Sequence, residues 1–391
     1  MYWSPATGAQ VVRSGPVATR WGAQGWETGA LGYPTGNTAC GLADNGCTQT
    51  FQHGALTTST TAGTHSVTGD VQTAWQRWDA QAGALGLPTS DRTCGLTAGG
   101  CVQQFQGGSV YDSTRTGAFV VRGAIRDAWT AQAGQDGALG YPLTDETCGL
   151  TGGGCSSQFQ GGTIYFSPAS GAHTLTGAIR TAWAAQGSEA GRLGYPTTDP
   201  SCGLTDGGCK QQFQSGWLYW SQASGAQPVV AGAVRDAWSA RSAEAGDLGY
   251  PVAAQFCGLV GGGCFQSFQD GWLYTSPASG AHATTTAFQV AWRAVGFEAG
   301  PLGYPVAEQV CGLTSGGCKQ QFQHGWVYST SATGGQATWG AIGDFWGAAS
   351  AERGKLGYPT GTPVFGLTRG GVFQSFQNGW VYWGWVTHTD V

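Results

Sequence analysis

The stretch Leu139-Gly140-Tyr141-Pro142 decides the fold because it returns at a fixed interval along the chain. The same turn starts at Leu31, Leu85, Leu139, Leu193, Leu248, Leu302 and Leu356. Successive copies are 54 residues apart, with one interval of 55, and one copy has Leu87 where the others have tyrosine. A period of this length is typical of arrays whose single units are too small to bury a core alone. The sequence therefore predicts seven tandem copies of one unit.

Each unit begins with a short helical pattern and continues into strands. Residues 123–129 place apolar side chains at positions i, i+3 and i+4, and their tryptophan recurs in every copy, which indicates a core position. In the turn that follows, glycine permits a positive φ and proline fixes the direction of the chain. Residues 202–219 then alternate as strands do, with Gly216 at a tight connection. Each unit is thus expected to hold one short helix and two to four strands.

The two ends of the chain suggest how the array is closed. Residues 2–10 match the end of a repeat, such as residues 219–227, whereas the last repeat runs out after Gly384. We therefore predict a repeat protein of the α+β, mainly β class, forming a closed, propeller-like ring in which the N-terminal strand completes the last unit. The expected single domain, 1–391, has units 15–68, 69–122, 123–176, 177–231, 232–285, 286–339 and 340–391, the last closed by 1–14.

The twelve cysteines form six pairs with six residues between the partners, and none is left over. The pairs are Cys40/Cys47, Cys94/Cys101, Cys148/Cys155, Cys202/Cys209, Cys257/Cys264 and Cys311/Cys318. Zinc is the rival interpretation, but each repeat offers only two such ligands and no recurring histidine. We expect local disulfides across a Gly-Gly turn, and hence an oxidising compartment. The seventh repeat has Phe365 and Val372 at these positions.

Composition excludes several classes of function. Charged residues make up 10% of the chain and the net charge is −5, so no basic surface is available for nucleic acid. Apolar runs fall well short of the roughly 20 residues that span a bilayer. The six histidines contain no His-Glu-x-x-His, and no serine elbow has a partner. We predict a monomer that is not an enzyme and has no catalytic residues, no metal and no cofactor.

Comparison of the seven copies points to one aromatic position. The residue after the hairpin glycine is, in order, Ala55, Ser109, Thr163, Trp217, Trp272, Trp326 and Trp380. A position that accepts both alanine and tryptophan is expected to be exposed, and exposed indoles reduce solubility unless they bind something. Tryptophan faces stack on the apolar face of sugar rings, so we interpret the four tryptophans as glycan platforms. The alternative is a larger core in the second half of the array.

Two polar positions complete the predicted sites. The first, four residues before each turn leucine, is Glu27, Gln81, Gln135, Glu189, Glu244, Glu298 and Glu352. The second follows Gly-Ala and is Gln10, His173, Gln227, His282 and Gln336, with His65 and Phe119 as outliers. Both positions suit sugar hydroxyls, although either could instead satisfy backbone groups. The glutamine after phenylalanine, present in every copy from Gln52 to Gln377, is assigned to backbone groups inside the unit.

These motifs together resemble a known family. The Leu-Gly-Tyr-Pro turn, the Gln-x-Phe-Gln segment and the Gly-Ala-His/Gln before a helical tryptophan are similar to the LGFP repeat of secreted and envelope proteins of actinomycetes. The resemblance implies a secreted, extracellular or cell-wall-associated module that binds a galactose-, arabinose- or rhamnose-containing glycan. We expect a multivalent, lectin-like protein, because weak contacts multiply on a repetitive polymer. The rival hypotheses are an envelope scaffold that binds proteins and, less favoured, a hydrolase.

Overall fold

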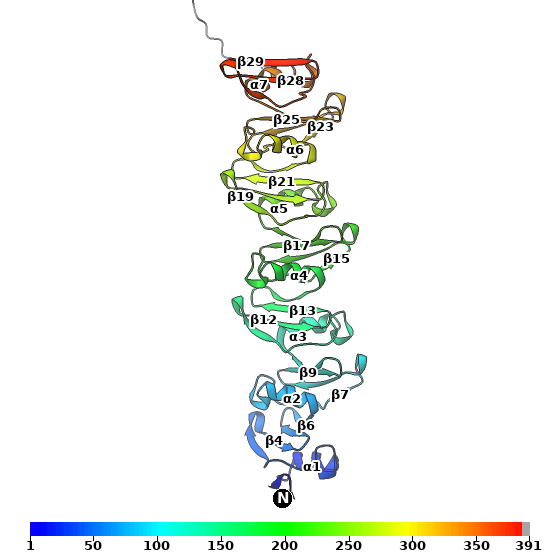
Figure 1. Cartoon of the computed structure of the whole chain (residues 1–391). Helices are drawn as coiled ribbons and strands as arrows, with labels where there is room; N and C mark the ends of the chain where they lie inside the picture. Colours follow the sequence, from blue (N-terminus) through cyan, green and yellow to red (C-terminus); the bar gives the residue numbers. More distant parts are fainter. Residues whose placement is uncertain (385–391) are drawn as a thin grey trace, which may run out of the picture. The chain divides into compact units, whose positions relative to one another are not determined.

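The computed structural model describes residues 1–384, so the end of the expected last unit, residues 385–391, lies outside the described part. The chain divides into two compact units. One contains Met1–Pro200 with Gln212–Gln214, and the other contains Ser201–Gln211 with Ser215–Val391. Within each unit, short helices alternate with small antiparallel sheets in the order of the sequence (Figure 1).

One α-helix opens each repeat of the described chain. The helices are α1 (Pro16–Ala23), α2 (Gly69–Arg77), α3 (Gly123–Ala131), α4 (Gly177–Ala185), α5 (Ala233–Ala240), α6 (Thr286–Ala294) and α7 (Gly340–Ala348). The buried side chains of each lie one turn apart, as Ile342 and Trp346 do in α7. This spacing keeps a narrow apolar stripe against the core and leaves the remaining positions free to vary.

Most of the sheets have four strands, each paired with its neighbour in sequence. The four-stranded sheets are β3 (Ala39–Leu42), β4 (Gly46–Phe51), β5 (Gly54–Ser59) and β6 (Gly63–Thr68); β7 (Thr93–Cys94), β8 (Cys101–Phe105), β9 (Gly108–Ser113) and β10 (Gly117–Val121); β11 (Thr147–Leu150), β12 (Gly154–Phe159), β13 (Gly162–Ser167) and β14 (Gly171–Leu175); β15 (Ser201–Cys202), β16 (Cys209–Phe213), β17 (Gly216–Ser221) and β18 (Gly225–Val230); β19 (Phe256–Leu259), β20 (Gly263–Phe268), β21 (Gly271–Ser276) and β22 (Gly280–Thr284); β23 (Val310–Cys311), β24 (Cys318–Phe322), β25 (Gly325–Thr330) and β26 (Gly334–Trp339). The prediction of a helix with a small meander in each unit is confirmed.

The recurring turn is held by two side chains of its own repeat. Gly303 has a φ of 67°, which favours glycine, and its carbonyl accepts a 3.0 Å hydrogen bond from Nε1 of Trp292. The next N–H, of Tyr304, donates a 2.9 Å hydrogen bond to Oε1 of Gln323. The same two bonds recur in most of the other repeats. Both interpretations are therefore confirmed: the invariant tryptophan is a core residue, and the invariant glutamine satisfies the backbone.

Helix α6 packs between the sheet that precedes it and the sheet of its own repeat. Around α6, the ring of Tyr274 on the preceding strand β21 lies edge-on to Trp292 at 4.6 Å. On the other side, Phe322 of β24 lies 5.3 Å from Trp292, and Val327 of β25 belongs to the same buried cluster. A repeat therefore buries its helix only with help from its neighbour, as is usual in repeat proteins.

The expected pairing of the N-terminal strand with the last repeat is not found in the sheets of residues 1–384. Strand β1 (Tyr2–Ser4) pairs only with β2 (Gly8–Gln10). The last sheet contains three strands, β27 (Val364–Leu367), β28 (Gly371–Phe376) and β29 (Gly379–Trp383). The physical reason is that Tyr2 lies edge-on to Trp21 of α1 at 4.5 Å, as Tyr274 does to Trp292. The N-terminal strand is thus already occupied in covering the first helix, and a closed ring is not confirmed.

All six predicted disulfides are present, and they join cysteines that lie directly opposite each other in neighbouring strands. In the seventh repeat, Val372 stands in place of the second cysteine and is buried. Phe365 stands in place of the first, and its ring stacks on that of Trp339 at 5.9 Å. Among the helices of the described residues, none is both long and apolar enough to cross a membrane.

Candidate functional site

The four predicted tryptophans occupy the second position of the third strand in their sheets, on the side that faces the next helix. Trp217, Trp272 and Trp326 are half-buried there, because each packs against the cluster around that helix. Trp380 is 65% exposed, since no helix of the described residues covers this face of the last sheet. Exposure at this position is therefore partial at three tryptophans and large only at the fourth.

Two of these indoles have a cation over one face. The ammonium of Lys210 lies 5.5 Å from the Trp217 ring, and that of Lys319 lies 4.9 Å from the Trp326 ring. The lysines come from the neighbouring strands β16 and β24. A cation within about 6 Å of a ring is attracted to its face. Each of these lysines therefore lies against one face of its tryptophan ring.

A groove of about 320 Å³ opens beside Trp326, between the sheet β23–β26 and helix α7. Its walls combine three indoles, one of them the core residue Trp346, with side chains that can make hydrogen bonds. They include Gln321, His324, Trp326, Trp339 and Asp344. The glutamine, histidine and aspartate are exposed, so their polar atoms need no partner within the protein and are available to a ligand.

The predicted glutamates lie at the same junctions, where Glu352 is close enough to Tyr328, and Glu298 to Tyr304, to affect the pKa of the tyrosine. Burial raises the pKa of Tyr328 to about 12, and the nearby charges of Glu352 and Tyr358 add to the rise. Burial and the charge of Glu298 likewise raise the pKa of Tyr304 to about 12. Glu352 is buried, whereas Glu189, Glu244 and Glu298 are half-buried. The tyrosines therefore remain neutral hydroxyl donors at ordinary pH, and Glu352 is not among the residues that line the groove.

The histidines and glutamines after Gly-Ala hold their own loops. Nε2 of His173 lies 2.8 Å from the carbonyl oxygen of Ser170, and Nε2 of His282 lies 2.9 Å from that of Ser279. Gln227 and Gln336 donate the equivalent bonds at 3.3 and 3.0 Å. His65 makes the same contact with Ala62 at 2.8 Å, so it belongs to this position and is not an outlier.

Sequence reasoning missed a polar residue that joins consecutive repeats. Six residues after the turn leucine, Asp91, Asp145 and Asp199 each accept a hydrogen bond from a backbone N–H in the last strand of the preceding repeat, at 3.1, 2.7 and 2.8 Å. Glu308 takes this position in a later repeat and bridges His282 at 3.1 Å and Arg241 at 2.8 Å. The signal was the recurrence of Asp, Asn or Glu at a fixed distance from the turn.

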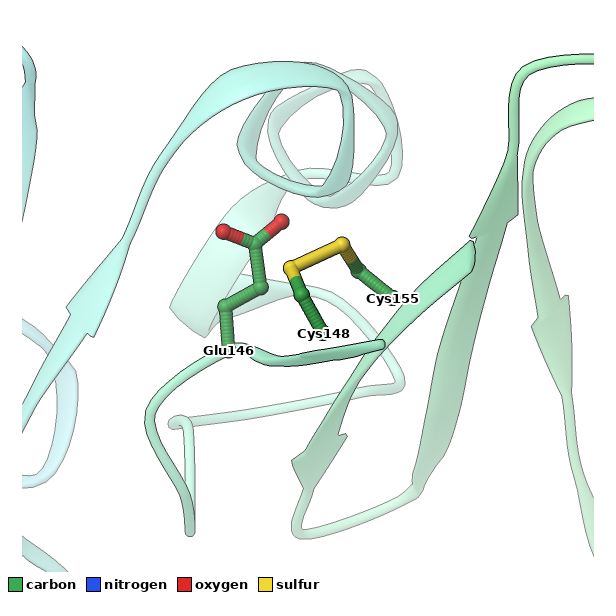
Figure 2. Close-up of side chains that lie close together, drawn as sticks. All are labelled: Glu146, Cys148 and Cys155. Atoms are coloured by element: carbon green, nitrogen blue, oxygen red, sulfur yellow. A yellow bond between two sulfur atoms is a disulfide. The ribbon is translucent and has the colours of Figure 1, made fainter. Parts of the chain in front are cut away.

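One group of potential metal ligands lies in the third repeat, where Glu146 lies beside Cys148 and Cys155 (Figure 2). The two sulfur atoms are bonded to each other, so neither is a thiolate that could ligate a metal. The carboxylate is already paired, because Nε of Arg122 lies 2.8 Å from its oxygen. This group is therefore a structural contact.

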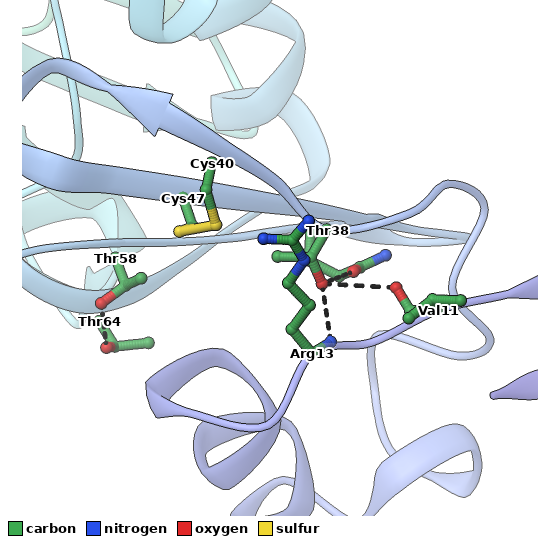
Figure 3. The surroundings of a disulfide bond; sticks show 8 residues. Val11, Arg13, Thr38, Cys40, Cys47, Thr58 and Thr64 are labelled. Carbon is green, nitrogen blue, oxygen red and sulfur yellow. Dashed lines mark hydrogen bonds between the residues drawn. A yellow bond between two sulfur atoms is a disulfide. The ribbon is translucent and has the colours of Figure 1, made fainter.

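The surroundings of the first disulfide are also structural. The Oγ1 atom of Thr38 accepts a 3.0 Å hydrogen bond from the N–H of Arg13 and lies 2.6 Å from Oε1 of Gln49 (Figure 3). The hollow beside Cys40 and Cys47 has a volume of only about 100 Å³. These bonds attach the N-terminal segment to the first repeat.

Comparisons with known proteins identify a repeat model over almost the whole chain. A model of the LGFP repeat matches residues 1–29, 31–83, 85–137, 139–191, 193–246, 248–300, 302–354 and 356–389. No curated protein matches the sequence.

Two solved structures show weak similarity. A catalytically inactive virginiamycin B lyase from Staphylococcus aureus, solved with quinupristin, is 8% identical, with a TM-score of 0.12 over 89% of this chain and 93% of the lyase. The extracellular domain of a one-component system from B. thetaiotaomicron is also 8% identical, with a TM-score of 0.12 over 88% of this chain and 38% of that domain. Similarity at this level supports no conclusion about fold or function.

Proposed function

This chain belongs to the LGFP repeat family, and from that premise we propose that it is a non-catalytic, extracellular module that binds carbohydrate at several of its repeat junctions. The partner is a surface or cell-wall glycan, with galactose-, arabinose- or rhamnose-containing polymers as the first candidates. Six disulfides support an oxidising, extracellular location, since such bonds are rare in reducing compartments.

The groove beside Trp326 is the observation that carries the proposal. A sugar ring offers an apolar C–H face and a rim of hydroxyls, so it is bound by a flat aromatic surface with hydrogen-bonding groups around it. Trp326 and Trp339 supply the aromatic surface, and Gln321, His324 and Asp344 supply the hydrogen-bonding groups. A volume of about 320 Å³ is at the lower end of the range for small-molecule sites. Such a groove suits one sugar unit of a larger polymer.

A single site of this kind binds weakly, and its repetition along the chain raises the affinity for a polymer. Trp217 and Trp272 hold the same position as Trp326 at two earlier junctions. A rigid row of weak sites that meets a repetitive polymer gains affinity from the effective concentration of the second and later contacts. We therefore expect weak binding of monosaccharides and much tighter binding of polysaccharides.

The experiment compares the wild-type protein with a variant carrying Trp217→Leu, Trp272→Leu and Trp326→Leu. Leucine keeps an apolar contact with the next helix but removes the flat ring. We expect retention on a polysaccharide column and calorimetric binding to be lost at an unchanged fold, judged by circular dichroism and melting. If the wild type binds no glycan on an array or column, the proposed function is wrong.

A second candidate function is that of an interaction scaffold, and the last sheet favours it. Trp380 and Tyr382 are 65% and 67% exposed on the face that a helix covers in the earlier repeats. The matching partner is an amphipathic helix bearing a tryptophan, because that is what packs on Tyr274 and Tyr328. The variant Trp380→Ser with Tyr382→Ser would abolish this binding without affecting glycan retention.

A further inference from the structure

Helix α7 differs from α2 to α6 on the side that faces the preceding sheet. The residue three positions before the core tryptophan is Gln72, Arg126, Arg180, Arg235 and Gln289 in α2 to α6, but Gly343 in α7. The residue after the core tryptophan is also a glycine in α7, Gly347. Both glycines line the groove beside Trp326.

In α4 and α6, the long side chain at the first of these positions bonds to the preceding sheet. Nη1 of Arg180 donates a 3.1 Å hydrogen bond to Oγ1 of Thr163, the residue that corresponds to Trp326. Nε2 of Gln289 donates a 3.2 Å hydrogen bond to the hydroxyl of Tyr274. The glycine of α7 has no side chain to occupy this place.

Gly347 has open space around it, and a Cβ at Gly343 would fit tightly against Thr338. Neither residue has a positive φ. A Cβ added to Gly347 would have no heavy atom within 4 Å, and one added to Gly343 would meet first the Oγ1 of Thr338, at 3.2 Å. Glycine in a helix interior costs about 1 kcal/mol relative to alanine. By contrast, a Cβ on Gly22 of α1 would lie 2.6 Å from the Trp26 ring, so that glycine has a packing reason.

We propose that Gly343 and Gly347 keep the Trp326 groove open as a site for one neutral sugar ring, and that the residue three positions before the core tryptophan sets how open the groove of each junction is. This inference rests on the proposed carbohydrate-binding function. A neutral ring is favoured because Lys319 is held against the Trp326 ring, while Asp344 offers a carboxylate that accepts hydrogen bonds from hydroxyls but repels an acidic sugar. Different junctions would then contribute unequally to polymer binding.

The test places in α7 the side chain that α3, α4 and α5 carry. Gly343→Arg would fill the groove, and we expect it to weaken the affinity for methyl galactoside or methyl rhamnoside at least tenfold, as measured by calorimetry and by tryptophan fluorescence. The matched control is Phe345→Arg, which adds the same side chain to an exposed position of α7 that does not line this groove. That control should keep the wild-type affinity.

Gly343→Ala provides the second measurement, because a methyl group leaves most of the groove open and should make the helix more stable. We expect a raised melting temperature with an affinity within about threefold of the wild type. If the wild type binds the glycosides and Gly343→Arg, folded by circular dichroism, binds them equally well, this inference is wrong while the proposed function stands. If the wild type binds neither glycosides nor polysaccharide, the proposed function itself has failed.

Discussion

The hydroxyl of Tyr304 donates a 2.6 Å hydrogen bond to the backbone carbonyl of Val260, in the preceding repeat. The same bond is made by the turn tyrosine at four other junctions, with distances of 2.6 or 2.7 Å. These five turns are therefore attached to the disulfide-bearing turn of the repeat before them. At Leu87, the hydroxyl is missing from the sequence.

Tyr304→Phe removes only this inter-repeat hydrogen bond. We expect the free energy of unfolding to fall by about 1 kcal/mol, because the carbonyl of Val260 loses its partner. Urea unfolding followed by tryptophan fluorescence measures the change. Tyr33→Phe is the control, since the hydroxyl of Tyr33 makes no such bond in the described residues, and an equal loss in both variants would contradict the role given to the bond.

Gly263→Ala should disturb the same junction from the other side. A Cβ on Gly263 would lie 2.0 Å from the hydroxyl oxygen of Tyr304, so we expect a loss of about 2 kcal/mol from overpacking. Adding Tyr304→Leu, which copies the natural Leu87, removes the clash with the tyrosine ring and leaves only the contact with the carbonyl oxygen of Thr275, at 2.9 Å. The double variant should then be more stable than the sum of the two single changes predicts, and strict additivity would show that the two residues are not coupled.

Cys257→Phe combined with Cys264→Val copies the natural pair of the seventh repeat, Phe365 and Val372. We expect the free energy of unfolding to fall by about 2 kcal/mol, because the cross-link no longer restricts the unfolded chain. The urea midpoint under non-reducing conditions measures this loss. A reducing agent should then lower the urea midpoint of the wild type more than that of the variant. If the variant and the wild type have the same midpoint under non-reducing conditions, this bond does not stabilise the protein.

His282 should make stability depend on pH. A hydrogen bond with Glu308 is the main cause that raises the pKa of His282 above 6.5, although burial opposes it. Burial alone would raise the pKa of Glu308, but contacts with His282 and Arg241 hold it below 4.5. A raised histidine pKa adds stability that is complete below pH 6.5 and is lost as pH rises through the folded-state pKa. The glutamate contribution is present above pH 4.5 and is lost in more acidic solution.

His282→Gln tests this dependence, because Gln227 and Gln336 hold the same position in other repeats. Stability measured by urea unfolding between pH 5.5 and 8.5 should fall more steeply for the wild type than for the variant. Parallel curves for the two proteins would exclude His282 as the source of the pH dependence.

Much of the candidate site could be located from the sequence, but the surroundings of its residues could not. Variation at the position of Trp326 predicted an exposed place, whereas Ala55, Ser109 and Thr163 are buried there and three of the four tryptophans are half-buried. The sequence did not show that the next helix would lie over this position, because that depends on how two repeats stack. Whether a tryptophan there borders an open groove is decided by Gly343, which is close in space but belongs to the next unit of the sequence.

Periodicity by itself determined the repeat, its helix, its sheet and its disulfides, because all of these rest on contacts within about 50 residues of chain. Only the tertiary structure decided which helix the N-terminal strand covers and which side chains link consecutive repeats. Tyr2 matches the third-strand tyrosine of a repeat, and that similarity is equally consistent with completing the last unit or covering the first helix. The choice depends on which aromatic partner the ring reaches in space, and in the structure that partner is Trp21.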